Sequence, residues 1–178
     1  MKEEMTITEA LKKLKRIEKR MAKNNEEIQR YASILSTEKP VFDSENKQKE
    51  EVAKLIQSNN DLEKEYETLK AAIDYTNMVT VVQIGEETRT IHGWLTVLRK
   101  TGGLLIQTYR SLNTSEAHSR QGRFRDREGT TPQIIRLYDE NEKRNGQRKW
   151  EDLTTGKEIE GRLEVINATT NLQASPEV

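Results

Sequence analysis

The 178-residue sequence contains no cysteine and only two histidines, and only 5% of its residues are aromatic. The absence of cysteine excludes a disulfide framework, a thiolate metal site and a cysteine nucleophile. The longest apolar runs, around residues 78–84 and 104–106, fall far short of the roughly 20 residues that a membrane-spanning helix needs. The chain therefore has the residues for only a few kinds of catalytic or metal-binding site.

Charge and polarity, by contrast, are abundant. Charged residues make up 34% of the chain and hydrophobic residues 33%, which is typical of extended helical proteins with a small core. Thirty Lys and Arg residues balance thirty Asp and Glu residues, so no net field draws the whole molecule to nucleic acid or anionic lipid. Residues 1–5 lead into polar helix without the apolar segment of a signal peptide. We therefore expect a cytoplasmic protein, or a virion protein if a phage encodes it.

Two segments with heptad patterning dominate residues 1–78. In the first, apolar residues fall at every seventh position, at Ile7, Leu14, Met21, Ile28 and Leu35. In the second, seam positions alternate at spacings of three and four, at Val52, Leu55, Asn59, Leu62, Tyr66, Leu69 and Ile73. Such spacing predicts helices whose apolar seam faces another helix.

The ends of these helices follow from local signals. Thr6 or Thr8 can cap the first helix, and Thr6 with Glu9 has the spacing of a capping box. The first helix should end before Lys39-Pro40, because the residue before a proline is driven out of helical geometry. Asp43 or Ser44 should cap the second, which runs to about residue 75 or 78.

A short connection between the two helices makes them antiparallel neighbours. Residues 1–37 hold nine Lys/Arg against six Asp/Glu, and residues 38–74 hold six against ten, so a basic helix would lie beside an acidic one. Folding the pair about residue 42 brings Asn25 opposite Asn59. They would form a polar layer that sets the register; the alternative is that Asn25 faces solvent.

The remaining chain predicts a smaller, mixed region. Residues 79–84 and 88–91 flank a turn at 85–87 and read as a β-hairpin. Thr90 should cap a third helix that Gly102-Gly103 interrupts by a kink, a close helix crossing or a hinge, since adjacent glycines weaken a helix. A polar loop over 113–132, a third strand over 134–138 and a last helix over 139–170 should follow.

The fold class that we predict is therefore mainly α. It consists of a long antiparallel, coiled-coil-like helical hairpin (1–78), then a small three-stranded sheet with two further helices (79–172), and a disordered tail (173–178).

Catalytic chemistry has few candidates. His92 and His118 have no second histidine at metal-ligand spacing. The sequence contains no Gly-x-Ser-x-Gly elbow, no phosphate-binding loop and no dinucleotide-binding glycine pattern. We expect no enzyme, no cofactor and no metal site.

The strongest candidate for a partner-binding loop is the basic segment 118–127. It places four arginines around one phenylalanine, at Arg120, Arg123, Phe124, Arg125 and Arg127. These residues could grip phosphates and stack on a base, or engage an acidic patch on a neighbouring subunit, or form a solvated surface loop. The neutral chain with its acidic second helix argues against a general nucleic-acid binder.

The last predicted helix carries a resemblance. Residues 158–172, Glu-Ile-Glu-Gly-Arg-Leu-Glu-Val-Ile-Asn-Ala-Thr-Thr-Asn-Leu, are similar to the closing segment of a family of uncharacterised bacterial and phage helical proteins, some of them described as septicolysin-like after a proposed cytolysin. Residues 7–11, 85–98 and 122–125 resemble the start, middle and basic loop of that family. The sequence departs from the family at residues 93–95, where the family tends to carry Ala-x-x-Arg-Asp. The resemblance implies a fold and self-association but no established activity.

We therefore predict a non-catalytic, self-assembling structural or scaffold protein, of which a phage virion or assembly component is one concrete form. The heptad seams would provide the homo-oligomer interface, through Leu14, Met21, Ile28, Leu62, Tyr66 and Leu69. Two alternatives stay open: a septicolysin-like membrane-active protein, and a nucleic-acid-binding adaptor that uses the 118–127 loop. The chain itself and other structural proteins are the expected partners, rather than nucleic acid or a membrane.

Overall fold

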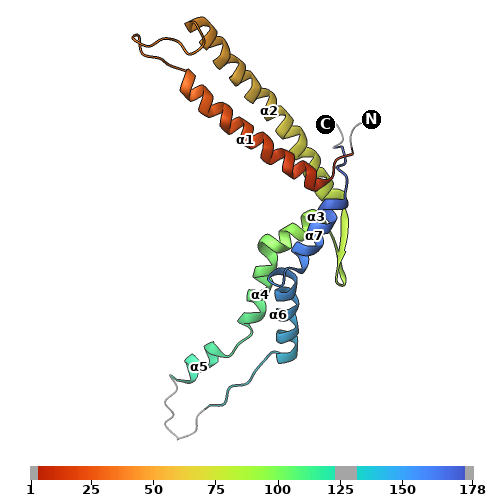
Figure 1. The fold of residues 1–178 in the computed structure, drawn as a ribbon. Helices are drawn as coiled ribbons and strands as arrows, with labels where there is room; N and C mark the ends of the chain where they lie inside the picture. Colours follow the sequence, from red (N-terminus) through yellow and green to blue (C-terminus); the bar gives the residue numbers. More distant parts are fainter. Residues whose placement is uncertain (1–3, 123–131, 175–178) are drawn as a thin grey trace. The chain divides into compact units, whose positions relative to one another are not determined.

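The computed structural model describes residues 4–122 and 132–174. This part of the chain is mainly helical, as predicted, and contains a two-stranded antiparallel sheet (Figure 1). The chain divides into two compact units. The first comprises Met1–Thr80 with Val165–Val178, and the second comprises Val81–Glu164.

The first unit is built on two long helices, α1 (Ile7–Tyr31) and α2 (Glu45–Val79), which pack against each other. The predicted capping box is present, because the Thr6 hydroxyl accepts from the Glu9 amide and the Glu9 carboxylate accepts from the Thr6 amide at 2.8 Å. Ser44, rather than Asp43, caps α2 by accepting from the Lys47 amide. Local sequence signals therefore set both helix starts.

The prediction that the first helix runs almost to Pro40 is wrong, because α1 ends at Tyr31. The buried side chain of Gln48 accounts for the early end. Its amide nitrogen donates to the Tyr31 carbonyl at 2.8 Å, and its oxygen accepts from the Val41 amide at 3.0 Å. This residue of α2 thus ties the last turn of α1 to the far end of the connecting loop. Leu35, assigned to the seam, lies in that loop and is 66% exposed.

The core of this unit lies between the two helices. Its members are apolar and buried: Ile7, Ala10, Leu14 and Ile17 from α1, and Leu62 and Ile73 from α2. The C-terminal segment attaches to the base of the hairpin. The Ile7 amide donates to the Thr170 carbonyl at 3.0 Å, and the Gln173 amide donates to the buried Thr76 hydroxyl at 2.9 Å.

The second unit begins with strands β1 (Val81–Ile84) and β2 (Glu87–Thr90), which pair antiparallel with Ile84 opposite Glu87. Gly85 in the turn has a φ of +58°, a conformation that glycine adopts without strain. The predicted β-hairpin is therefore present. The predicted third strand is wrong, since residues 134–138 have no regular secondary structure and no partner strand. An apolar β-branched run becomes a strand only where another strand can pair with it.

Thr90 caps α3 (Ile91–Thr96), as predicted, by accepting from the Gly93 amide at 3.1 Å. A π-helical segment (Val97–Thr101) joins α3 to α4 (Gly102–Ser111). Trp94 is fully buried and its indole nitrogen donates to the Val82 carbonyl at 2.8 Å, which fastens α3 to the sheet.

Gly102 marks a close helix crossing, one of the three roles predicted for the glycine pair. A Cβ atom at this position would lie 2.4 Å from the Thr154 methyl group and 2.9 Å from the Val97 carbonyl oxygen. A Cβ atom at Gly103 would meet no atom within 4 Å. The approach of α4 to the helix that carries Thr154 therefore depends on the first glycine of the pair.

The last part of the chain corrects two predictions. Residues 113–132 are not all loop, because α5 (Ser115–Gln121) forms within them, started by the Asn113 side chain accepting from the Ser115 amide. The single helix predicted over 139–170 is two helices, α6 (Glu140–Thr154) and α7 (Glu158–Thr169). Between them Lys157, the residue directly before α7, has a φ of +63°, a left-handed conformation that a continuous helix cannot contain. Asp139 caps α6 by accepting from the Asn141 and Glu142 amides.

Candidate functional site

A polar layer crosses the hairpin between α1 and α2. The Asn59 amide nitrogen donates to the Asn25 oxygen at 2.8 Å, so the structure brings the predicted pair together. The Asn24 amide nitrogen donates to the Asn59 oxygen at 2.9 Å and to the Ser58 hydroxyl at 3.2 Å. Asn24 is buried, with 8% of its surface exposed, whereas Asn25 is exposed. The heptad pattern did not lead us to predict Asn24, although Asn24 lies seven residues after the buried Ile17.

The six residues predicted as a subunit interface lie on α1 and α2 of one chain. Leu14 and Leu62 are buried there, so a second chain can reach them only if the two helices separate. The predicted role of these two residues in a subunit interface is therefore corrected, because they pack within one chain. The other four are partly exposed, namely Met21, Ile28, Tyr66 and Leu69. The Tyr66 hydroxyl donates to the Glu18 carboxylate at 3.2 Å, and this hydrogen bond raises the pKa of Tyr66.

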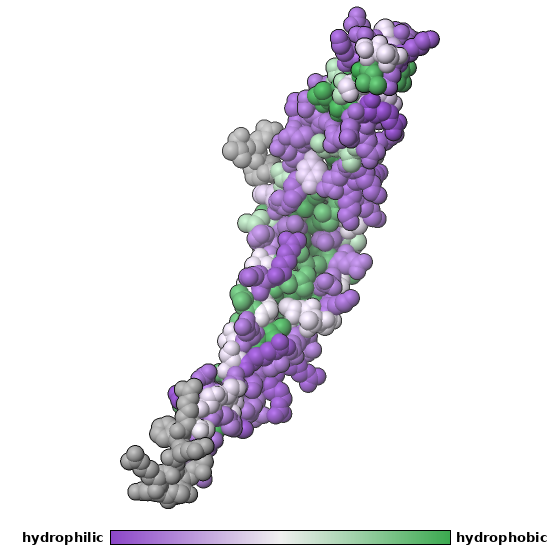
Figure 2. Space-filling view, turned by 90° about the vertical axis from the view of Figure 1, so that its left-hand side faces the viewer, coloured by the Kyte–Doolittle hydropathy of each residue, from purple (hydrophilic) through white to green (hydrophobic). Residues whose placement is uncertain are grey.

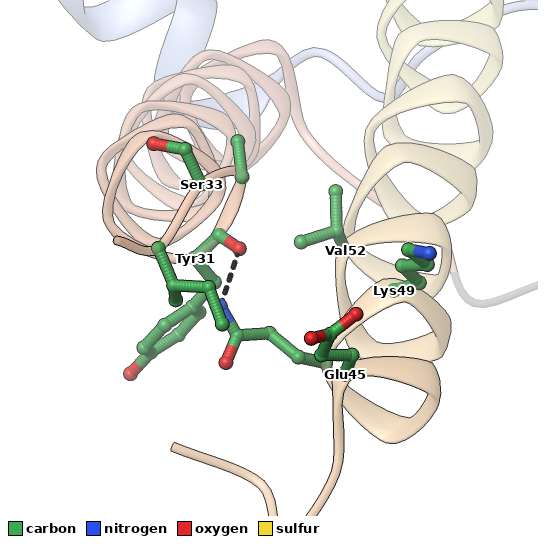
Figure 3. A pocket seen from close by; sticks show the side chains of 8 residues that line it. Tyr31, Ser33, Glu45, Lys49 and Val52 are labelled. Atoms are coloured by element: carbon green, nitrogen blue, oxygen red, sulfur yellow. Dashed lines mark hydrogen bonds between the residues drawn. The ribbon is translucent and has the colours of Figure 1, made fainter. Parts of the chain in front are cut away.

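An apolar groove opens at the tip of the hairpin, where α1 ends and α2 begins (Figure 3). It holds about 240 Å³ and is lined by Tyr31, Ala32, Ser33, Ile34, Glu45, Gln48, Lys49 and Val52. The connecting loop beside it exposes Leu35 and Val41, by 66% and 63%. Figure 2 shows hydrophobic residues among hydrophilic ones at this tip, at the top of the view. The tip surface, meaning this groove with Leu35 and Val41, is a place where apolar area meets solvent.

A second apolar surface lies in the segment that was wrongly predicted to form a third strand. Ile135 and Leu137 are exposed by 79% and 92%. The segment is held at both ends, because the Gln121 side chain donates to the Pro132 carbonyl and the Tyr138 hydroxyl donates to Glu140 at 3.1 Å. Burial raises the pKa of Tyr138, with a smaller effect from Glu140. The segment 132–138 thus presents two large aliphatic side chains to solvent.

The predicted arginine loop is described only in part. Arg120 is exposed on α5, and the His118 ring bonds the Thr114 carbonyl at 2.9 Å within the same helix. Arg123, Phe124, Arg125 and Arg127 lie outside the described residues. The binding role of this segment therefore stays a prediction.

The most connected ion pairs of the second unit surround Glu87. Its carboxylate lies 2.5 Å from the Lys149 ammonium and 2.7 Å from the Arg89 guanidinium. Hydrogen bonds from Lys149 and then Arg89 lower the pKa of Glu87 below its ordinary value. The carboxylate links β2 to α6, which is a structural role.

Over the described ranges, 4–122 and 132–174, no group of three His, Asp or Glu residues could hold a metal ion. His92 is exposed on α3, away from the buried face that carries Ile91 and Trp94. None of the helices in this part of the chain is long and apolar enough to cross a membrane. The surfaces described above are thus the candidates for function.

Comparison with protein families, curated proteins and solved structures finds no match for this chain. The resemblance to septicolysin-like proteins accordingly stays a prediction.

Proposed function

We propose that this chain is a non-catalytic structural protein that assembles with copies of itself, a phage virion or assembly component being one form of such a protein. The tip surface carries the proposal. Exposed loops of soluble proteins are normally polar, yet this loop exposes Leu35 and Val41 next to an apolar groove. Contiguous apolar surface of this kind marks sites of protein contact.

The tip surface has the features of a contact between identical chains. It combines an exposed apolar side chain, Leu35, with a groove that could receive one. The groove rim carries Glu45 and Lys49, which have no ion pair among the described residues. In a contact with two-fold symmetry the same patch meets itself. Glu45 of one chain would then face Lys49 of the other, and both pairs would form at once.

The segment 132–138 supplies a second apolar surface on the other unit. Ile135 and Leu137 are far more exposed than aliphatic residues of a folded core. A chain with two separate apolar surfaces can contact more than one neighbour. This property supports an assembly larger than a dimer.

The experiment that tests the proposal compares the sedimentation of three forms of the full chain. One carries Leu35→Ser with Val41→Ser, a second carries Ile135→Ser with Leu137→Ser, and the unmodified chain is the third. We expect an oligomer for the unmodified chain and a smaller species for each variant, because each loses apolar contact area.

Matched controls are available beside each surface. Thr37→Ser lies in the same connecting loop, and Gln133→Ser lies in the same extended segment; both positions are exposed and polar. Both controls should sediment as the unmodified chain does. If all forms sediment as monomers of 20.7 kDa, the proposal fails.

A further inference from the structure

Positive charge is concentrated in one part of α1, although the net charge of the whole chain is zero. Residues 12–23 hold seven Lys and Arg residues and a single Glu, Glu18. Lys12, Arg16, Lys19 and Lys23 recur at spacings of four, three and four, which places them on one face of the helix. Lys15 lies beside them. These five residues are exposed, and we call them the basic stripe.

The packing of α1 explains why the stripe faces solvent. Three of its four regular members come two residues after a buried residue: Lys12 after Ala10, Arg16 after Leu14, and Lys19 after Ile17. Two residues turn an α-helix by about 200°, so these cations point away from α2. The stripe runs over about 16 Å, from the rise of about 1.5 Å per residue.

The carboxylates of α2 do not neutralise the stripe. Glu65 of α2 pairs with Lys13, on the flank of α1, at 2.6 Å. Among the residues that the structure describes, the stripe has one ion pair, from Lys23 to Glu27 at 3.8 Å, and the Lys23 side chain is 74% exposed. The stripe therefore keeps almost all of its positive charge for an external partner.

We infer that the basic stripe binds the phosphate backbone of double-stranded nucleic acid. Four of its five members are lysines, and lysine is depleted in protein–protein interfaces, which favour aromatic and apolar anchors. A helix that binds a membrane surface buries an apolar face in the lipid, but α1 buries that face against α2. A straight row of lysines and one arginine, without an aromatic residue to stack on a base, suits sequence-independent contacts to duplex phosphates.

A second copy of the chain is a poorer partner for the stripe. The exposed side chains of α2 mix the two signs, with Glu50, Lys54, Lys64 and Glu67 among them. A row of cations gains nothing from a face on which cations and anions alternate. The inference is therefore independent of the self-assembly proposed above.

The test is the binding of the full chain to a fluorescent 25-base-pair DNA duplex, followed by anisotropy at several salt concentrations. We expect saturable binding that weakens with salt. The slope of log affinity against log salt should lie near −4, since each neutralised phosphate contributes about −0.9 and the stripe offers up to five cations.

Two variants that lose the same charge locate the contact. The stripe variant carries Lys12→Gln, Arg16→Gln, Lys19→Gln and Lys23→Gln. The control variant carries Lys47→Gln, Lys54→Gln, Lys64→Gln and Lys70→Gln, all exposed on α2. The stripe variant should lose at least about tenfold in affinity and most of the salt slope, while the control stays within about threefold of the unmodified chain. Circular dichroism shows whether both variants keep their helices.

Three outcomes would overturn the inference. The unmodified chain could fail to bind the duplex at about 50 mM salt, where phosphate contacts are strong. The two variants could lose the same affinity, which would show a general effect of charge. The chain could bind vesicles containing anionic phospholipid but not the duplex, which would assign the stripe to a membrane surface.

Discussion

The Asn59 side chain bonds two consecutive residues of the opposite helix, donating to Asn25 at 2.8 Å and accepting from Asn24 at 2.9 Å. One amide thereby joins an exposed residue to a buried one across the hairpin. A buried asparagine in a helical seam costs stability but disfavours other registers, in which it would lose its partners. The three asparagines thus bear directly on how α1 aligns with α2.

Replacing Asn24 by Ala should destabilise the hairpin by about 1–2 kcal/mol, because the Asn59 oxygen and the Ser58 hydroxyl would lose a partner in a partly buried site. Urea unfolding measures the change in the free energy of unfolding. Asn60→Ala is the control, since Asn60 is exposed on the same helix as Asn59. Equal losses in the two variants would contradict a role for the polar layer.

Replacing Gly102 by Ala should destabilise the second unit by about 1–3 kcal/mol, the usual cost of overpacking. The new methyl group would overlap the Thr154 methyl group and the Val97 carbonyl. The neighbouring Gly103→Ala should be neutral or stabilising by up to about 1 kcal/mol, because alanine favours helix and has open space there. Thermal unfolding of both variants distinguishes them.

Thr154→Ser in the Gly102→Ala background should recover part of the loss. Serine lacks the obstructing methyl group and keeps the hydroxyl that donates to the Trp150 carbonyl at 2.6 Å. No recovery would mean that the Val97 backbone, rather than Thr154, sets the cost.

The lowered pKa of Glu87 predicts a dependence of stability on pH. The carboxylate favours the folded state above its ordinary pKa of 4.5, and this contribution is lost as the pH falls through the lower folded value. Glu87→Gln should therefore be less stable than the unmodified chain at pH 7, by under about 1 kcal/mol for a partly exposed pair. The difference should shrink at pH 3. Glu86→Gln, in the adjacent turn, should show no such change, and a constant difference for Glu87→Gln would contradict the account.

A charge placed at Leu62 distinguishes a seam that packs within one chain from a seam that joins two subunits. Leu62 is buried against α1 of its own chain, so Leu62→Glu should unfold the first unit by burying an unpaired carboxylate. Circular dichroism should show lost helix. A variant that kept full helicity but lost subunits would instead restore Leu62 to the subunit interface.

Several features could be predicted from the sequence because their causes are local. Thr6, Ser44, Thr90 and Asp139 start helices through bonds to residues two or three positions away. The β-hairpin is local as well, since Gly85 makes its turn. The heptad spacing correctly brought Asn25 near Asn59 because antiparallel helices joined by a short loop pair residues about a fixed centre.

Other features could not be predicted because they depend on contacts distant in sequence. The Gln48 side chain bonds the last turn of α1 at Tyr31, which lies seventeen residues before it in the chain. No sequence pattern near Tyr31 indicates that α1 ends there. Residues 134–138 have the composition of a strand, but pairing depends on a neighbour that the fold does not bring. The basic stripe was concealed because net charge sums over both helices, whereas binding depends on the face that each helix turns outward.

The measurement that tests self-assembly most directly is the absolute mass of the unmodified chain by light scattering over a range of concentrations. The account predicts a defined multiple of 20.7 kDa that persists as the concentration rises. A mass of 20.7 kDa at every concentration would contradict it, and would show that the exposed tip and the segment 132–138 do not join copies of this chain.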